Sequence, residues 1–314
     1  MSLRIHKPGI QASIQDAGRL GYQHWGVPVG GAMDILSMQA ANLICGNDLS
    51  AAVIECTLHG TLIEFQEPHQ FTVTGAGAIA TLNNRPISFN ELISASTGDL
   101  FQLHPNPNGC RSYIAVCGGF AIEPDLNSCS TYPPAKLGGI NGDYLKAGDT
   151  LAICTRKNGV RHQALADTNN SSHEESNQSI LKKAKNNAAL TQKEVTIKIH
   201  RGPEWDWFDL FAKENLLKKQ WVVGNNANRM AYLLNGPALQ KIDTQELVST
   251  AVTRGIIQVT TSGQPIILMA DAQTIGGYPR IAWVCSNDLP ILAQCRPGAQ
   301  LNFQLQELVD AIDN

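Results

Sequence analysis

The sequence has little net charge and lacks any long apolar run. Its 24 Lys and Arg residues stand against 27 Asp and Glu among 314 residues, a net charge of −3 at pH 7. This balance creates no positive field that would gather phosphates, so we expect no nucleic-acid partner. No window approaches the roughly 18 apolar residues of a membrane span, and residues 1–10 lack the apolar core of a signal peptide. We therefore expect a cytoplasmic protein with no membrane partner.

Closely spaced metal-ligating residues are also missing. The eight cysteines stand singly at positions 45, 56, 110, 117, 129, 154, 285 and 295, and no two have the short spacing of a zinc site or a redox pair. The eight histidines form neither His-x-His nor His-Glu-x-x-His. We expect no protein-built metal site, and cysteines that act as small buried apolar residues in a reducing compartment.

Aromatic residues make up only 6% of the chain, whereas glycine and proline are frequent, at 27 and 15 residues. Glycine and proline disfavour helices and mark turns. Short apolar stretches rich in β-branched residues lie between the turn signals, at 61–65, 71–74, 113–117, 150–154, 195–199, 255–259, 265–269, 281–284 and 300–305. The pattern predicts an all-β class, mainly β with a few short helices.

Two helices and one polar segment interrupt the strand pattern. Asp34 can cap a helix that runs to about Cys45, and residues 205–217 form an amphipathic stretch with aromatic anchors. Within 158–194, residues 167–179 contain no large apolar side chain, which is typical of a mobile linker. We therefore expect an N-terminal half over 1–157, a polar flexible linker over 158–194 and a C-terminal half over 195–314.

The densest group of functional side chains lies in the glycine-rich segment 14–34. Five glycines between residues 18 and 34 allow a ligand to approach the backbone closely. Polar side chains able to bind carboxylate, amide and carbonyl groups stand among them, namely Asp16, Arg19, Tyr22, Gln23, His24 and Asp34. The alternative is a long surface loop in which Asp16 and Arg19 pair with each other.

A second group follows an apolar strand, in the segment 269–280 that includes Asp271 and Tyr278. The alternative is a hairpin with the glycine pair 276–277 at its tip. A third segment, 128–132, offers hydroxyls without a nearby base and makes a weak nucleophile site. His24 and His200 are isolated histidines, which are most often structural, and either acts as a base only if the fold brings a second charged group beside it.

Seven motifs in order resemble the biotin-dependent carboxyltransferase family, which includes the C subunit of 5-oxoprolinase and is also described as KipA-like or as allophanate hydrolase subunit 2. The motifs occupy residues 14–28, 31–34, 130–132, 145–149, 228–232, 263–265 and 271–279. The resemblance implies two tandem cyclophilin-like β-barrel domains. Where relatives commonly carry an arginine, this chain has Cys129, a departure that bears on substrate or partner preference.

The resemblance also implies an activity. Similar stand-alone bacterial proteins act with a B subunit, their direct partner, and with an A subunit as an ATP-dependent 5-oxoprolinase that opens 5-oxo-L-proline to L-glutamate. ATP, with magnesium, is then a substrate of the whole complex, and the chain is inactive alone. A first alternative is carboxyl transfer from carboxybiotin to urea or a similar amide, with biotin as cofactor. A second is a non-catalytic regulator that antagonises a kinase inhibitor. Because the chain lacks a biotin carboxylase region and a biotin-carrier Met-Lys motif, the 5-oxoprolinase interpretation is favoured.

The hypothesis for the site places residues of both halves across a cleft between the two barrels. Catalytic roles fall to Asp16, Arg19, Asp271 and Gln273. Substrate-binding roles fall to Gln15, Tyr22, Gln23, His24, Asp34, Arg229, Thr274, Gly276, Gly277 and Tyr278. A basic residue, Arg19 or Arg229, would hold the substrate carboxylate, and glycine N–H groups with Gln273 would polarise the lactam carbonyl.

Overall fold

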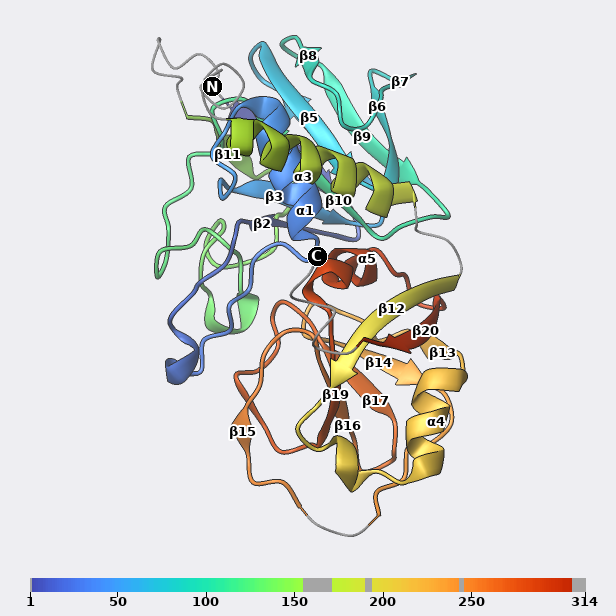
Figure 1. The fold of residues 1–314 in the computed structure, drawn as a ribbon. Helices are drawn as coiled ribbons and strands as arrows, with labels where there is room; N and C mark the ends of the chain where they lie inside the picture. Colours follow the sequence, from blue (N-terminus) through green and yellow to red (C-terminus); the bar gives the residue numbers. More distant parts are fainter. Residues whose placement is uncertain (1, 155–170, 190–193, 243–245, 307–314) are drawn as a thin grey trace. The chain divides into compact units, whose positions relative to one another are not determined.

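The computed structural model of the protein describes residues 2–154, 171–189, 194–242 and 246–306 (Figure 1). The chain divides into two units, each of which is described by itself. The N-terminal unit comprises residues 1–19 and 30–190, and the C-terminal unit comprises residues 20–29 and 191–314. The units differ from the predicted halves in two respects. The segment 20–29 groups with the second unit rather than with the first, and residues 158–190 of the predicted linker group with the first unit.

Two antiparallel sheets form the N-terminal unit. The first sheet has the order β11 (Thr150–Ala152), β1 (Ser2–Pro8), β4 (Thr61–Phe65), β9 (Leu100–Pro105), β6 (Ala78–Leu82) and β7 (Arg85–Pro86). The second has the order β2 (Gln11–Gln15), β3 (Val53–Thr57), β10 (Arg111–Val116), β5 (His69–Gly75) and β8 (Ile93–Ala95). Both sheets contribute side chains to a single core, for example Ile5 and Phe65 from the first sheet and Ile14 and Phe71 from the second.

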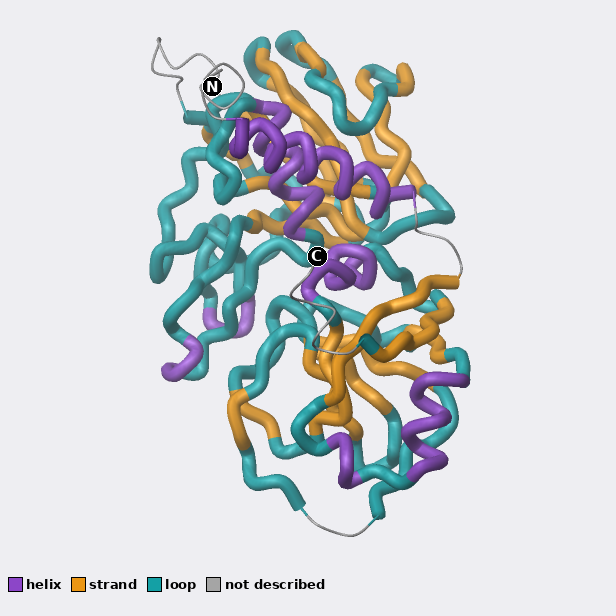
Figure 2. Tube along the Cα trace, viewed as in Figure 1, coloured by secondary structure: helices purple, strands orange, loops and turns teal. Residues whose placement is uncertain are grey.

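Helix α1 (Ile35–Cys45) packs on the second sheet (Figure 2). Its buried residues Met38 and Ala41 cluster with Val53 of β3 and Ala115 of β10. The Asp34 side chain accepts a hydrogen bond from the Ser37 backbone N–H at 3.0 Å, and Gly46 ends the helix in the left-handed conformation. The helix predicted from Asp34 to about Cys45 is therefore confirmed.

A second helix corrects the expectation of a flexible linker. Residues 171–189 of the predicted linker 158–194 form helix α3 (Ser171–Ala189), which contacts α1 and β5. Ala184 and Asn187 are buried, and they lie three residues apart on one helix face. Tertiary contact along that face stabilises a helix that the polar composition alone would not predict. The remaining linker residues 155–170 and 190–193 lie outside the described residues.

The C-terminal unit is a closed seven-stranded barrel, which agrees with the predicted mainly-β barrel class. Its strand order is β12 (Glu194–Arg201), β19 (Arg280–Val284), β16 (Ile256–Val259), β17 (Pro265–Leu268), β14 (Ala231–Asn235), β13 (Trp221–Val223) and β20 (Gln300–Leu305). Along β12, Val195, Ile197 and Ile199 point into the barrel, and Lys198 lies on the outer face.

Further short elements of the C-terminal unit lie outside the barrel sheet. They are β15 (Thr250–Ala251), which pairs with β18 (Ile275–Gly276), the short 3-10 turns η1 (Gln23–Trp25), η3 (Trp205–Trp207) and η4 (Ser286–Asp288), and helices α4 (Leu210–Lys218) and α5 (Leu289–Ala293). The remaining turn, η2 (Pro133–Ala135), belongs to the N-terminal unit. The helix predicted over 205–217 is thus two elements. Phe208 is fully buried, as expected of an aromatic anchor. Phe211 is 75% exposed, so Phe211 is not a core residue.

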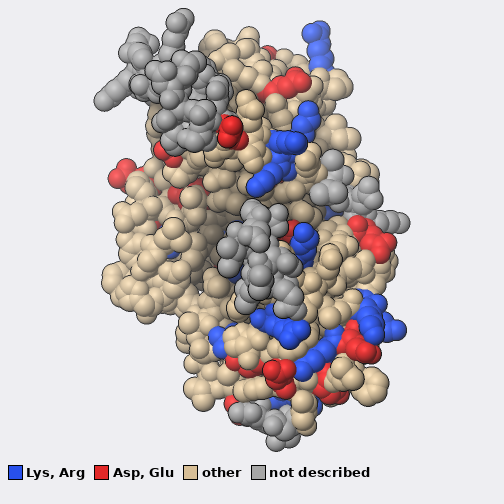
Figure 3. All heavy atoms as spheres, in the orientation of Figure 1, with Lys and Arg blue, Asp and Glu red and all other residues tan. Residues whose placement is uncertain are grey.

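Basic and acidic side chains are interspersed on the surface around α4 (Figure 3). Lys213 forms an ion pair with Asp206, and Lys218 forms one with Glu214. All eight cysteines lie in the described part of the chain, and none forms a disulfide. Among the described residues, no cluster of three His, Cys, Asp or Glu could hold a metal ion, and no helix has the length and hydropathy needed to cross a bilayer.

Candidate functional site

Asp16 follows β2, and its carboxylate is held by four hydrogen bonds from its own unit. The hydroxyls of Ser128 and Ser130 donate to it at 2.7 and 2.5 Å, and the backbone N–H groups of Cys129 and Gly18 donate at 2.5 and 2.8 Å. The residue is 8% exposed. A buried carboxylate is stable only with such donors, so Asp16 fixes the segment 128–130 in place.

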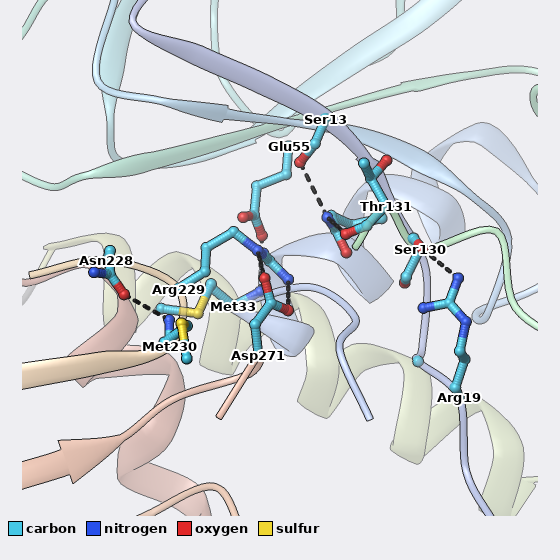
Figure 4. A network of polar contacts seen from close by, with 12 residues as sticks. Ser13, Arg19, Met33, Glu55, Ser130, Thr131, Asn228, Arg229, Met230 and Asp271 are labelled. Atoms are coloured by element: carbon cyan, nitrogen blue, oxygen red, sulfur yellow. Dashed lines mark hydrogen bonds and ion pairs between the residues drawn. The ribbon is translucent and has the colours of Figure 1, made fainter. Parts of the chain in front are cut away.

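Arg19 holds the same segment through its carbonyl groups (Figure 4). Its Nε donates to the Asp125 carbonyl at 3.1 Å, and its Nη2 donates to the carbonyls of Ser128 and Ser130. The side chain is 1% exposed. Asp16 and Arg19 are therefore not surface charges, because both lie inside the unit and organise residues 125–130.

Gly138 is required by this arrangement. Its φ is +63°, and a Cβ built on it would lie 2.6 Å from Arg19 Nη2 and would also meet the Ser130 carbonyl. Its backbone N–H donates to Asp125 Oδ2 at 2.7 Å. A left-handed backbone at van der Waals distance from a buried guanidinium leaves room for glycine alone.

Gln15 and Asp34, both predicted to bind substrate, hold local structure. Gln15 is fully buried, and its amide donates to Ser13 Oγ at 3.0 Å and to the Thr131 carbonyl at 3.3 Å. Asp34 caps α1 and also accepts from the Ser37 hydroxyl at 2.6 Å. These two side chains support the loops that carry the glycine-rich motif.

Sequence reasoning missed a buried cluster centred on Glu55. This carboxylate accepts from the Met33 N–H at 2.7 Å and from the Tyr113 hydroxyl at 2.9 Å, and Arg111 Nε lies 3.8 Å away. Tyr113 in turn accepts from the Asp34 N–H at 2.7 Å. Burial, followed by the Glu55 and Asp34 charges, raises the pKa of Tyr113 well above its usual value. The available signal was a glutamate inside the apolar strand Val53–Thr57.

Residues Tyr22, Gln23 and His24 lie on or beside the short turn η1. The rings of Tyr22 and His24 contact Trp25, with centroids 5.6 and 4.9 Å apart, and Trp25 is 67% exposed. The Gly21 N–H donates to Gln23 Oε1 at 3.1 Å. The segment therefore presents an exposed group of aromatic and amide side chains.

In the C-terminal unit, Arg229 and Asp271 form a buried ion pair (Figure 4). Arg229 Nε and Nη2 donate to the two carboxylate oxygens at 2.8 Å each, and the Asp271 N–H donates to the Arg229 carbonyl at 2.8 Å. Both residues are 4% exposed. This bidentate pair links the end of β17 to the loop before β14.

Gln258 on β16 holds the rest of the second motif, and sequence reasoning missed it. Its Nε2 donates to the Tyr278 carbonyl at 3.0 Å, and its Oε1 accepts from Gln273 Nε2 at 3.5 Å. A Cβ on Gly276 would lie 2.8 Å from the Gln258 amide, so the strand β18 passes directly over it. Gln273 is exposed and Tyr278 is 42% exposed, while Thr274 is buried.

Arg280, the last residue of the segment 269–280, forms a second bidentate ion pair. Its Nε and Nη2 donate to Glu204 at 2.8 and 2.7 Å. Burial alone would raise the pKa of Glu204, but the hydrogen bonds and charge of Arg280 outweigh burial and lower it.

A cavity of about 610 Å³ opens beside this motif within the C-terminal unit. Its lining includes Gly277 and Tyr278, hydroxyls from the 260–262 turn, and the opposite charges of Lys241 and Glu246. Gly277 and Tyr278, both predicted as substrate-binding residues, therefore face a space large enough for a small molecule.

Cys129 stands where the resemblance places an arginine. The thiol packs partly against the core and donates to the Ile122 carbonyl at 3.5 Å. Burial, and then the Asp16 charge, raises the pKa of Cys129 to about 11, so the thiol is neutral at pH 7. The network around Asp16 uses the Cys129 backbone rather than its side chain.

The family profile "Carboxyltransferase domain, subdomain A and B" matches residues 25–305, and the chain belongs to this family. It is 33% identical to the C subunit of 5-oxoprolinase from Escherichia coli K12, over 99% of this chain and 93% of the relative. It is 35% identical to the C subunit of 5-oxoprolinase from Haemophilus influenzae, over 96% of this chain and 90% of the relative.

A solved structure is also similar. The crystal structure of the Kluyveromyces lactis urea carboxylase matches 98% of this chain with a TM-score of 0.86 and 28% identity. The match spans 27% of that much longer protein.

The structure thus brings together some of the predicted site residues within each unit. Asp16 and Arg19 share the segment 125–130, Arg229 pairs with Asp271, and Gln273 meets Tyr278 through Gln258. That the motifs of the two units serve one substrate site stays a prediction.

Proposed function

We propose that this chain is the C subunit of an ATP-dependent 5-oxoprolinase, which opens 5-oxo-L-proline to L-glutamate together with the A and B subunits in the cytoplasm. The observation that carries the proposal is the near full-length match to two relatives that are named as C subunits of 5-oxoprolinase. A match over only one of the two units would not have supported a role for the whole chain.

The C-terminal motif supports the proposal chemically. A lactam is a resonance-stabilised amide, and its opening places negative charge on the carbonyl oxygen. The exposed Gln273 side chain, whose Nε2 lies 3.5 Å from Gln258 Oε1, offers an N–H donor for that oxygen. A preorganised donor of this kind contributes about 3 to 4 kcal/mol to transition-state stabilisation.

Asp271 acts in this proposal through Arg229. Because both carboxylate oxygens of Asp271 accept from the Arg229 guanidinium, the pair fixes the start of the 271–279 segment. Asp16 and Arg19 do the same for the segment 125–130 in the other unit. We therefore assign these four residues to positioning, and Gln273 and Tyr278 to substrate contact.

The donor set does not fit a nucleotide. In the cavity of the C-terminal unit, Lys241 and Glu246 carry opposite charges that cancel, whereas a triphosphate needs a surplus of positive charge. We propose that another component of the complex binds ATP with magnesium. The direct companion in the proposal is the B subunit.

Carboxyl transfer to urea or a similar amide is the second candidate. The observation that favours it is the similarity to the Kluyveromyces lactis urea carboxylase, which extends over 98% of this chain. The cavity lining mixes apolar side chains such as Leu247 and Val259 with the hydroxyls of Thr260 and Ser262, a composition that suits the neutral ring of biotin.

Reconstitution tests the proposal. The chain is mixed with the A and B subunits from the same source, and L-glutamate is measured with 5-oxo-L-proline and ATP present. We expect glutamate only from the complete mixture, and none from the chain alone.

Two glutamine variants locate the activity. Gln273→Ala should lower the rate about 100-fold or more, as loss of a carbonyl-polarising donor does. Gln220→Ala, at an exposed glutamine that donates to Glu194 at 3.2 Å, is the matched control and should leave the rate unchanged. Equal rates in both variants would remove Gln273 from the site. Absence of glutamate from the complete mixture would reject the 5-oxoprolinase function.

A further inference from the structure

Three neighbouring strands of the C-terminal barrel bring a cysteine, a histidine and a glutamine together. On β12, Ile199 pairs with Val284 of β19 and with Leu305 of β20. The next residues, His200 on β12 and Gln306 after β20, are therefore side by side. Cys285 follows β19, and its backbone N–H donates to the Lys198 carbonyl of β12 at 2.9 Å. His200 lies on the outer face of β12, because Ile199 beside it points into the barrel.

The contacts fix the tautomer of the imidazole. His200 Nδ1 lies 2.9 Å from the backbone carbonyl oxygen of Gln306, which can only accept, so Nδ1 carries the proton in the neutral ring. Nε2 then has a free lone pair, and Cys285 Sγ lies 3.3 Å from it. With Nδ1 protonated, Nε2 is an acceptor within hydrogen-bond reach of the Cys285 thiol, the relation of a general base to its nucleophile.

A second acceptor and two charges also face the thiol. Gln306 Oε1 lies 3.3 Å from Cys285 Sγ and competes with Nε2 for its proton. Burial, and then the Asp288 carboxylate, raises the pKa of Cys285, while Lys198 opposes that shift. The thiol is therefore neutral at pH 7, and its reactivity depends on a base that takes the proton during attack.

The other cysteines differ from Cys285. Five are buried or carbonyl-bound, namely Cys45, Cys56, Cys110, Cys117 and Cys295, and Cys129 donates to the Ile122 carbonyl. Cys154 is exposed and serves as a reference thiol. Cys285 combines partial exposure with a contact to an oriented imidazole, so an adjacent base can take the thiol proton during attack.

We propose that Cys285 is a nucleophilic modification site, with His200 as its general base, and that it reacts with low-molecular-weight disulfides. As Cys285 Sγ bonds to one sulfur of the disulfide, its proton passes to His200 Nε2. The disulfide S–S bond breaks, and the departing thiolate takes up a proton from the imidazolium. Cys285 sulfur is oxidised to a mixed disulfide, and the leaving sulfur is reduced to a thiol. Partial shielding of the thiol restricts the reagent to a small disulfide.

The test measures mixed-disulfide formation with oxidised glutathione on the full chain, read at Cys285 and Cys154 by peptide mass spectrometry. The ratio of the two rates in the same molecules cancels differences in reagent and folding. We expect His200→Gln to lower this ratio about tenfold or more, since general-base assistance contributes at least that much. His200→Asn is the second variant, and should lower the ratio similarly.

A further variant separates base catalysis from packing. Gln306→Ala removes the competing Oε1 but keeps the backbone carbonyl that orients His200, so the ratio should hold or rise. A ratio that is unchanged or higher in both His200 variants would overturn the proposal, because His200 would then only shield the thiol. A fall in Gln306→Ala as large as in His200→Gln would overturn it too, since loss of packing would explain both. The readout is independent of any 5-oxoprolinase activity.

Discussion

Removing the charge of Asp271 tests the buried ion pair that holds the C-terminal motif. Asp271→Asn keeps the shape of the side chain but leaves the Arg229 guanidinium facing a neutral amide. In the native chain the two side chains are only 6% and 4% exposed, and two 2.8 Å bonds join them. Solvent therefore cannot replace the lost charge.

The expected loss of unfolding free energy follows from that geometry. Two opposite charges about 4 Å apart attract by about 4 kcal/mol at the effective dielectric constant of partly shielded sites. Loss of one partner of a buried pair typically costs about 3 to 5 kcal/mol, because the other charge stays buried. We expect Asp271→Asn to lower the free energy of unfolding by that amount. Arg229→Met with Asp271→Leu should cost less than the sum of the two single changes, because neither charge is left behind.

Tryptophan fluorescence during urea unfolding is the appropriate assay. All five tryptophans, at positions 25, 205, 207, 221 and 283, belong to the C-terminal unit, so the signal reports the unit that carries the pair. A loss below about 1 kcal/mol for Asp271→Asn, or strictly additive costs in the double variant, would refute this reasoning.

Three further predictions follow from the same contacts. Gly138→Ala should lower the free energy of unfolding by more than about 3 kcal/mol, because the new side chain adds both backbone strain and a clash. Gly119 has a φ of +79° but open space around it, so Gly119→Ala should lower it by only about 1 kcal/mol. Equal losses in urea unfolding would argue against the clash. The depressed pKa of Glu204 contributes stability that is present above its usual value of 4.5 and is lost as pH falls through the lower folded value. Urea midpoints should therefore drop with acidification less steeply in Glu204→Gln, which no longer titrates against Arg280, and parallel pH profiles would contradict this. Arg19→Ala should abolish ATP-dependent glutamate release by the three-component mixture, because the segment 125–130 loses its guanidinium; near-normal activity would reject its role.

Much of the fold was predictable because strand and turn signals are local. The turn glycines, the cap at Asp34 and the apolar alternation of 195–199 each act over a few residues, and the structure has the corresponding elements. Helix α3 was not predictable, since its stabilising contacts with α1 and β5 are far away in the sequence. The exposure of Phe211 likewise depends on how α4 packs, which the helical spacing does not define.

The candidate site was predictable as two motifs but not as networks. Asp16 and Arg19 stand out among glycines, yet their partners at 125–130 lie more than 100 residues further on. Gln258 and Glu55 were missed because each is a single polar residue inside an apolar strand. The sequence does not distinguish such a residue from one whose side chain faces solvent. Only the register that sets Glu55 opposite Tyr113 reveals the cluster.

The most direct test of the proposed function uses one complete mixture of this chain and the A and B subunits. Two sets of substrates are added to separate portions of that mixture in parallel. One set contains 5-oxo-L-proline and ATP, and the other contains urea, bicarbonate, ATP, a biotin carboxylase and a biotinylated carrier. The proposal predicts L-glutamate from the first set and no carboxylated urea from the second. Carboxylated urea without any glutamate would contradict it and would establish this chain as a carboxyltransferase component.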